Sequence, residues 1–266
     1  MDWYAASPRG VKGQMLAAVT ILTLFYMPAV AQQNTANNPL TDIPMIQAQD
    51  YLQTGIRDEP RTVAYQRLTV PWEFGGFKQL MRISAEAGST VAKPDGTVSG
   101  LGDTTIYNVP IFTFPGFKMG VGPLAIIPTA SNPVLGDRQW QIGGEGVISA
   151  PFSWGLLGGL VSYQQVVDGS SRSITAQPFI FGNLAHGFYL RSTGITMADL
   201  VRDSTVLPIG FGLGRVMPLE NGNVLNFYVE PQFSVVRTSD DKPLFQIFVG
   251  VNLQFPPQKS VRHQDH

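Results

Sequence analysis

The sequence predicts an all-β fold in which about twelve antiparallel strands close into an up-and-down transmembrane barrel. Three observations lead to this prediction. Apolar and polar residues alternate with a period of two in many successive segments. The composition is rich in turn residues, with 28 Gly and 20 Pro, and only 14% of the residues are charged. An N-terminal export signal is followed by no apolar run long enough for a membrane helix.

The clearest alternation runs from Leu244 to Phe255. One face holds large apolar side chains, namely Phe245, Ile247, Val249, Val251, Leu253 and Phe255. The other face is polar or small apart from Phe248, which suits a barrel wall between lipid and a polar lumen. A strand of a soluble sandwich can alternate in the same way, so this segment alone leaves both folds open.

The same segment resembles the closing strand that the assembly machinery of bacterial outer-membrane barrels recognises. The matching residues are Gly250, Leu253 and the aromatic Phe255. The resemblance implies that the barrel-assembly machinery is a partner during biogenesis. An eleven-residue tail, residues 256–266, follows Phe255 here, whereas that signal usually stands at the very end of the chain.

The N-terminus has the features of a secretory signal peptide. Arg9 and Lys12 precede the apolar run from Met15 to Tyr26, and Ala29-Val30-Ala31 forms a small-residue cleavage site. The run is shorter than the ~20 residues of a spanning helix. We therefore expect a signal peptide at residues 1–31 and a mature chain from Gln32, located in the outer membrane of a Gram-negative cell.

The composition also excludes several function classes. The absence of Cys rules out a thiol nucleophile, a Cys-ligated metal and a lipoprotein anchor. The formal net charge is -1 and the basic residues are scattered, so we expect no nucleic-acid partner. We expect no cofactor, and we expect outer-membrane lipid and an unidentified small-molecule solute as partners.

The mature chain divides into three predicted parts. Residues 32–46, rich in Asn, Pro and Thr, predict a flexible periplasmic leader; residues 47–255 form the barrel, and residues 256–266 a flexible tail. The predicted strands are Gln47–Gly55, Thr62–Val70, Lys78–Glu86, Thr104–Phe112, Phe117–Ile127, Arg138–Ala150, Gly155–Gln165, Ile174–Asn183, Gly187–Ala198, Val206–Val216, Val224–Val236 and Leu244–Phe255. The first of them alternates weakly, so a count of about ten strands stays open beside about twelve.

The predicted connections alternate between two classes. The longer, mostly charged set is Ala87–Gly102, Thr129–Asp137, Val166–Ser173, Asp199–Thr205 and Arg237–Pro243. The tighter set is Pro71–Gly76, Phe114–Gly116, Pro151–Trp154, Leu184–His186 and Pro218–Asn223. Short periplasmic turns and longer extracellular loops are typical of outer-membrane barrels, whereas a soluble sandwich gives no reason for this alternation. Both termini would then be periplasmic.

Two strands indicate what faces the lumen. In Val224–Val236 an apolar row opposes a polar row that contains Glu230, so this carboxylate should point inward. In Val206–Val216 the inner row is Gly210, Gly212 and Gly214, which leaves room for a large lumen side chain or lets the wall curve. Aromatic residues near strand ends predict girdles at the two membrane interfaces; they are Trp140, Phe152, Trp154, Tyr163, Phe188 and Tyr189.

Segments along most of the mature chain resemble one family, the outer-membrane barrels grouped with the phenol-degradation meta-pathway transporter-like proteins. The matching segments are Ser99–Asp103, Gly120–Thr129, Trp140-Gln141, Ser153–Val161, Gln177–Phe181, Gly187–Ser192, Pro208–Gly214, Val229–Gln232 and Phe245–Gly250. The resemblance implies an outer-membrane barrel with a role in the passage of small hydrophobic or aromatic compounds. It supplies no catalytic or binding residues.

Four charged residues within predicted strands form the candidate site, namely Arg82, Glu145, Arg191 and Glu230, and Arg67 is a further charge in a predicted strand. Because charges on the lipid face are costly, we expect the four to point inward as one polar network. Such a network either selects solutes at a constriction or fills a narrow barrel with ion pairs, and we favour the second interpretation.

We predict a channel or uptake protein for small molecules. The alternatives are a plugged barrel with a structural or adhesive role and an outer-membrane lipid-modifying enzyme. We expect no enzyme, because a catalytic triad at the external rim would need a histidine there. His186 lies in a predicted periplasmic turn, and His263 and His266 lie in the tail, which has no fixed geometry for a metal site.

Overall fold

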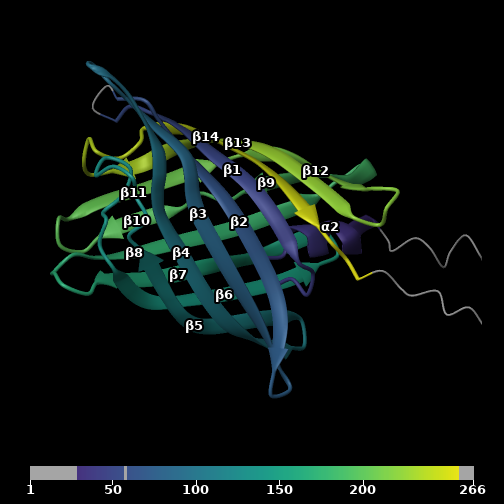
Figure 1. The fold of residues 1–266 in the computed structure, drawn as a ribbon. Helices are drawn as coiled ribbons and strands as arrows, with labels where there is room; N and C mark the ends of the chain where they lie inside the picture. Colours follow the sequence, from purple (N-terminus) through teal and green to yellow (C-terminus); the bar gives the residue numbers. More distant parts are fainter. Residues whose placement is uncertain (1–28, 57–58, 258–266) are drawn as a thin grey trace, which may run out of the picture.

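The computed structural model describes residues 29–56 and 59–257, which form a closed antiparallel barrel with one α-helix at one of its ends (Figure 1). The helix is α2 (Ala29–Asn37), and η1 (Ala185–Gly187) is a short 3-10 turn. The strands are β1 (Met45–Thr54), β2 (Arg61–Phe74), β3 (Phe77–Lys93), β4 (Gly96–Phe114), β5 (Phe117–Ile127), β6 (Gln141–Phe152), β7 (Gly155–Val166), β8 (Arg172–Asn183), β9 (Phe188–Ser192), β10 (Thr196–Asp199), β11 (Ser204–Gly210), β12 (Gly212–Pro218), β13 (Val224–Arg237) and β14 (Phe245–Gln254).

Pairing between the first and last strands closes the barrel. β1 pairs with β14 along its whole length, from Met45 opposite Gln254 to Thr54 opposite Phe245. β9 and β10 both pair with β8, and β11 and β12 both pair with β13, so each of these two couples makes a single crossing of the wall. The 14 strands therefore make twelve crossings. The predicted all-β up-and-down barrel and its count of about twelve are confirmed, and the count of ten is wrong.

The two interrupted crossings were predicted as continuous strands. The segment Gly187–Ala198 breaks between β9 and β10, and Val206–Val216 breaks at Phe211. Pro208 and Pro231 lie beside these breaks and have no N–H to donate to the ladder, and the β11–β13 register shifts next to Pro208. The wall is therefore irregular in one region, next to the charged residues described below.

The predicted faces of the wall are confirmed in β13 and β14. In β14 the residues from Gln246 to Gln254 at even positions are buried, while the outward row is exposed or half-exposed. β13 shows the same alternation, with Glu230 on the buried row. Among the described residues, no helix is long and apolar enough to span a bilayer.

Most of the predicted girdle residues lie on the outer surface. Trp140, Phe152, Trp154 and Tyr163 are exposed. Tyr189 is the exception, because its position in β9 turns it into the lumen, where it is fully buried. The prediction that Tyr189 belongs to a girdle was therefore wrong.

Asp50 interrupts the outward row of β1. Its neighbours on that row are Ala48 and Leu52, and it stands opposite Val249 of β14. One of its carboxylate oxygens is shielded from solvent and has no hydrogen-bond partner. This residue explains the weak alternation of the first predicted strand, and a carboxylate on a lipid-facing row is expected to lower the stability of the barrel.

The longest predicted loop, Ala87–Gly102, is instead part of the sheet. β3 continues to Lys93 and β4 begins at Gly96, so only two residues form the turn. Val91 opposite Val98 and Thr90 opposite Ser99 continue the ladder beyond two register shifts. The prediction of a loop was wrong because these β-branched and small residues sustain pairing. The hairpin projects beyond the barrel at the end opposite α2 (Figure 1).

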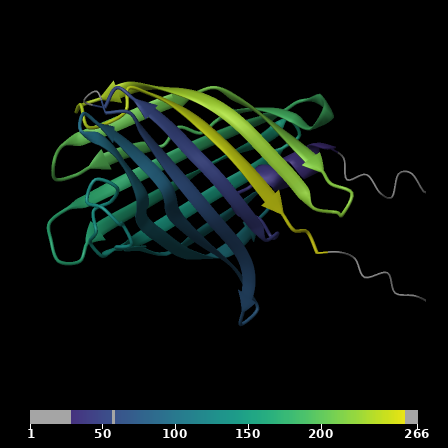
Figure 2. The ribbon, with the colours of Figure 1, turned by 45° about the horizontal axis from the view of Figure 1, so that its top comes forward.

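The predicted flexible leader, residues 32–46, folds into the barrel. Residues 29–44 form a plug segment: α2 lies at one end of the barrel (Figure 2), and Leu40 and Thr41 are fully buried. The Asn and Gln residues that suggested a loop are the ones whose amides bond to the wall, as described below. We call this end of the barrel the α2 end and the opposite one the loop end.

The predicted signal peptide falls mostly outside the described residues, which begin at Ala29. Cleavage after Ala31 would leave α2 from Gln32 to Asn37. The predicted C-terminal tail, apart from Pro256 and Pro257, also lies outside the described residues.

Candidate functional site

A buried ion pair occupies the wall break. Arg191 Nε donates to Glu230 Oε2 at 2.7 Å, and the two side chains are 5% and 0% exposed. The Glu230 carboxylate also accepts hydrogen bonds from the Thr193 N–H and hydroxyl, both at 2.7 Å, and from Gln232 at 2.9 Å. Thr193 lies in the gap between β9 and β10, so the break frees its N–H for Glu230. The pair is fully hydrogen-bonded, which a buried ion pair requires.

Glycines in the wall make room for these large lumen side chains, as predicted for the inner row of β11 and β12. A Cβ at Gly210 or Gly212 would collide with Glu230, and one at Gly214 would collide with the Tyr189 ring. Gly250 of β14 gives the same room to Tyr228. The glycines therefore allow the charged and aromatic side chains to lie flat against the wall.

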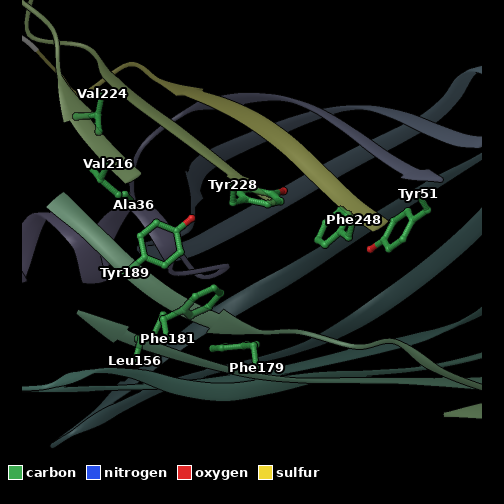
Figure 3. Close-up of a cluster of buried hydrophobic side chains, with 10 residues drawn as sticks. All are labelled: Ala36, Tyr51, Leu156, Phe179, Phe181, Tyr189, Val216, Val224, Tyr228 and Phe248. Atoms are coloured by element: carbon green, nitrogen blue, oxygen red, sulfur yellow. The ribbon is translucent and has the colours of Figure 1, made fainter. Parts of the chain in front are cut away.

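An aromatic layer surrounds Arg191 and narrows the lumen. Its guanidinium lies 3.5 Å from the Tyr228 ring centroid and 5.0 Å from that of Phe248. Tyr51 stacks on Phe248 with ring centroids 4.2 Å apart. Figure 3 shows these rings on one side of the lumen and Phe179, Phe181 and Tyr189 on the other. Arg191 therefore makes cation–π contacts with these rings in addition to its ion pair with Glu230.

Arg82 and Glu145 point into the lumen as predicted, with 8% and 5% exposure, but they do not pair. Among the described residues, no carboxylate lies within 4.0 Å of Arg82, whose Nε donates to Thr69 at 3.4 Å. Arg82 is on β3 and Glu145 on β6, three strand spacings or roughly 14 Å apart along the wall. Arg82 and Glu145 line one chamber and attract each other electrostatically, but of the four predicted charges only Arg191 and Glu230 form an ion pair.

Arg67 was not part of the predicted site, but it belongs with Arg82. It stands opposite Ser84 while Thr69 stands opposite Arg82, so the two arginines are diagonal neighbours on β2 and β3. The Arg67 guanidinium lies over the Tyr65 ring at 4.7 Å, and its Nε is buried without a hydrogen-bond partner. Its inward position follows from the alternation of β2, which was visible in the sequence.

Two spaces follow one another inside the barrel. A chamber of about 470 Å³ lies toward the loop end, where Arg202 and Lys242 line it together with Glu145 and Tyr107. A void of about 90 Å³ lies between the chamber and the plug segment. Arg67 and Arg82 line both spaces, and Arg191 lines the void. The interior is therefore a wide polar chamber that leads to a narrow, arginine-lined void above α2.

Side-chain amides hold α2 against the wall. Gln33 donates to the Leu184 and Phe188 carbonyl oxygens at 3.1 and 2.8 Å. Asn34 donates to the Phe152 carbonyl oxygen at 3.0 Å, and Asn226 donates to Asn37 at 3.0 Å. These neutral contacts fix the plug segment at strand ends without any covalent link.

An ion-pair cluster fixes the residues after α2. Asp42 contacts Lys118 at 2.9 Å and Lys78 at 3.4 Å. Burial raises the pKa of Asp42, but hydrogen bonds and charge attraction from Lys118 and Lys78 outweigh it and hold that pKa below its ordinary value of 3.8. Leu40, two residues before Asp42, is fully buried and packs in one apolar cluster with Leu80 and Val109 of the wall. Contacts with the wall therefore hold both α2 and the residues that follow it in the plug segment.

The three histidines were the candidates for a catalytic triad or a metal site. His186 is exposed in the η1 turn at the α2 end, away from the loop end, while His263 and His266 lie outside the described residues. Among the described residues, no group of three potential metal ligands comes together.

Comparison with known proteins links the fold to outer-membrane barrels. No protein-family model matches the chain, and a sequence comparison with curated proteins gives no match. Among solved structures, an outer membrane channel from Pseudomonas putida F1 is similar, with a TM-score of 0.58 at 12% identity over 80% of this chain and 94% of the channel. The NanC porin gives a TM-score of 0.50 at 10% identity, over 80% of this chain and all of the porin. This chain has the fold of outer-membrane channels.

A weaker likeness concerns an enzyme. Outer membrane phospholipase A from Escherichia coli gives a TM-score of 0.40 at 12% identity, over 86% of this chain and 98% of the phospholipase. A likeness of that strength carries no argument about activity.

Proposed function

We propose that the protein is a narrow outer-membrane channel for small organic solutes, and that the plug segment restricts passage through it. The observation that carries this proposal is the chamber of about 470 Å³ that narrows to an arginine-lined void above α2. A barrel with only a structural role needs no such unfilled chamber. The resemblance to the phenol-degradation meta-pathway transporter-like barrels also favours solute passage and remains part of this proposal.

The orientation is part of the proposal. The loop end would face the exterior and the α2 end the periplasm, so that both termini are periplasmic. The support is the difference in connection lengths, which are tight at the α2 end in η1 and between β6 and β7, and longer between β5 and β6 at the loop end.

Solute flux into liposomes tests the channel. The chain from Gln32 is refolded into phospholipid vesicles, and osmotic swelling is followed in arabinose and in sucrose. A narrow channel should admit arabinose faster than protein-free vesicles do and should exclude most sucrose. Swelling no faster than in protein-free vesicles would favour a structural or adhesive role instead. That the protein is no enzyme stays a prediction, and release of fatty acid from the same vesicles would contradict it.

A further inference from the structure

We propose that the void above α2 binds the carboxylate group of small aromatic monocarboxylic acids. The inference rests on the proposed channel for its biological meaning, because it names the class of solute that would pass. Three features of the void carry it: the charge of its lining, the unpartnered donors in and beside it, and its size next to aromatic rings.

The void has a strong excess of positive charge. Arg67, Arg82 and Arg191 line it, and no acidic residue does so among the residues that the structure describes. Of these three arginines, only Arg191 has a carboxylate of the described residues within 4.0 Å. That carboxylate belongs to Glu230, whose oxygens are already occupied by Arg191, Thr193 and Gln232. Arg67 and Arg82 thus bring two guanidinium groups, with no carboxylate of the described residues in contact, into a confined space, where unpaired charge is costly, and Glu145 attracts them only from the chamber side. An anion bound in the void would offset that cost.

One unpartnered hydrogen-bond donor lies at the void and a second lies in the adjoining chamber. Arg67 Nε is buried and has no partner, and the hydroxyl of Tyr107, a residue only 6% exposed, has none either. Tyr107 stands opposite Arg82 on the neighbouring strand and lines the floor of the chamber. Arg67 and Arg82 are diagonal cross-strand neighbours, roughly 7–8 Å apart at the backbone, so their guanidinium groups can converge on one carboxylate.

The void is large enough for the group that the arginines would bind. A volume of about 90 Å³ holds several water molecules, so a carboxylate fits within it. The ring would remain at the chamber floor, against Tyr107, Leu124 and Leu160. In the chamber a second carboxylate would meet as many acidic as basic side chains, Glu145 among them, so it would lose water without net attraction and monocarboxylates are favoured over dicarboxylates.

Equilibrium binding to the refolded full mature chain tests the inference without any need for conduction. Isothermal titration calorimetry at pH 7 in detergent compares sodium benzoate with benzamide, acetate and phthalate. We expect saturable binding of benzoate, and binding at least tenfold weaker for each of the other three. Absence of saturable benzoate binding, or equal binding of benzamide, would overturn the role of the arginines. Equal binding of acetate or phthalate would overturn the assignment of the solute as an aromatic monocarboxylate.

Matched variants locate the site. Arg67→Gln and Arg82→Gln should each weaken benzoate binding about tenfold or more, as loss of a charge-assisted bond implies. Arg215→Gln, on the outward row of β12, is the control and should leave binding unchanged. Equal loss in all three variants would overturn the site, and the corresponding methionine variant, Arg67→Met or Arg82→Met, replaces a glutamine variant that fails to refold. Benzoate binding without solute flux would contradict only the proposed channel, whereas flux without binding would contradict only this inference.

Discussion

Arg191 and Glu230 are each needed for the burial of the other. Removing one member leaves a charge without its partner in a site that is almost fully buried. Arg191→Ala should therefore lower the free energy of unfolding by about 3–5 kcal/mol, the range for breaking a buried pair. Urea titration of the protein refolded in lipid vesicles measures this change.

Arg215→Ala is the control for the loss of an arginine, because this side chain faces outward and contacts the Phe188 ring. It should cost clearly less than Arg191→Ala. Similar losses for the two variants would mean that water solvates the Arg191 site and that the pair does not hold the wall together.

Replacing Asp50 should raise the stability of the barrel, whereas replacing Arg191 should lower it. Its carboxylate stands on an outward row between apolar neighbours, where acidic residues lower barrel stability. Asp50→Leu should raise the free energy of unfolding by about 1 kcal/mol or more, measured in the same titration. Ala48→Leu adds similar apolar surface on the same row and should have a smaller effect. A destabilised Asp50→Leu variant would show that Asp50 does not face lipid.

The two faces of β14 can be distinguished by substitution with arginine. Val249 is on the outward row, so Val249→Arg near the midplane should cost about 2–4 kcal/mol through contact with lipid. Gly250→Arg points inward and should fail for lack of space, because Tyr228 fills the position of any side chain there.

A second substitution separates these causes. Tyr228→Ala should partly restore the folding of Gly250→Arg and should not help Val249→Arg. Equal rescue of both variants would contradict the register of the strand.

Asp42 should make the attachment of the plug segment sensitive to acid. Because the pKa of Asp42 is lowered in the folded protein, its contribution is present above its ordinary pKa of 3.8 and is lost as the pH falls below that value. Its side chain is 45% exposed, so solvent limits the effect. Solute flux in wild type and Asp42→Asn should therefore differ at pH 6 and converge near pH 3. A constant difference across this range would exclude Asp42 as the titrating group.

The strands could be predicted from the sequence because one face meets lipid and the other a polar lumen. Glu230 was recognised as an inward charge from this alternation, and Arg191 from the cost of a charge on the lipid face. The grouping of the four charges could not be predicted in this way, since alternation gives the face of a residue but not its distance from a residue on another strand. Arg82 and Glu145, for example, face the same chamber but form no ion pair.

The plug segment was missed for a different reason. Residues 32–46 show no helical apolar pattern, and their Asn and Gln residues suit a loop in water equally well. Only the closed wall supplies the carbonyl groups to which Gln33 and Asn34 donate. The prolines at the wall breaks were visible in the sequence and could have predicted the interruptions of both crossings.

At the scale of the whole molecule, the barrel and its N-terminal segment act together. The wall encloses a chamber that is too wide to be filled by its own side chains, and the aromatic layer, the arginines and α2 narrow the path below it. In the proposed channel, side chains of the wall and the plug segment therefore restrict flow in series.

Single-channel conductance in planar bilayers tests this account most directly. The chain from Gln32 is compared with a variant that lacks residues 32–42 and with Leu40→Asp. Because Leu40 is fully buried, a charged side chain there is costly and should displace the plug segment. The account predicts small conductance for the wild type and a several-fold larger conductance for both variants. Identical conductance in all three, with each barrel folded, would contradict the assignment of the plug segment as the restriction of a channel.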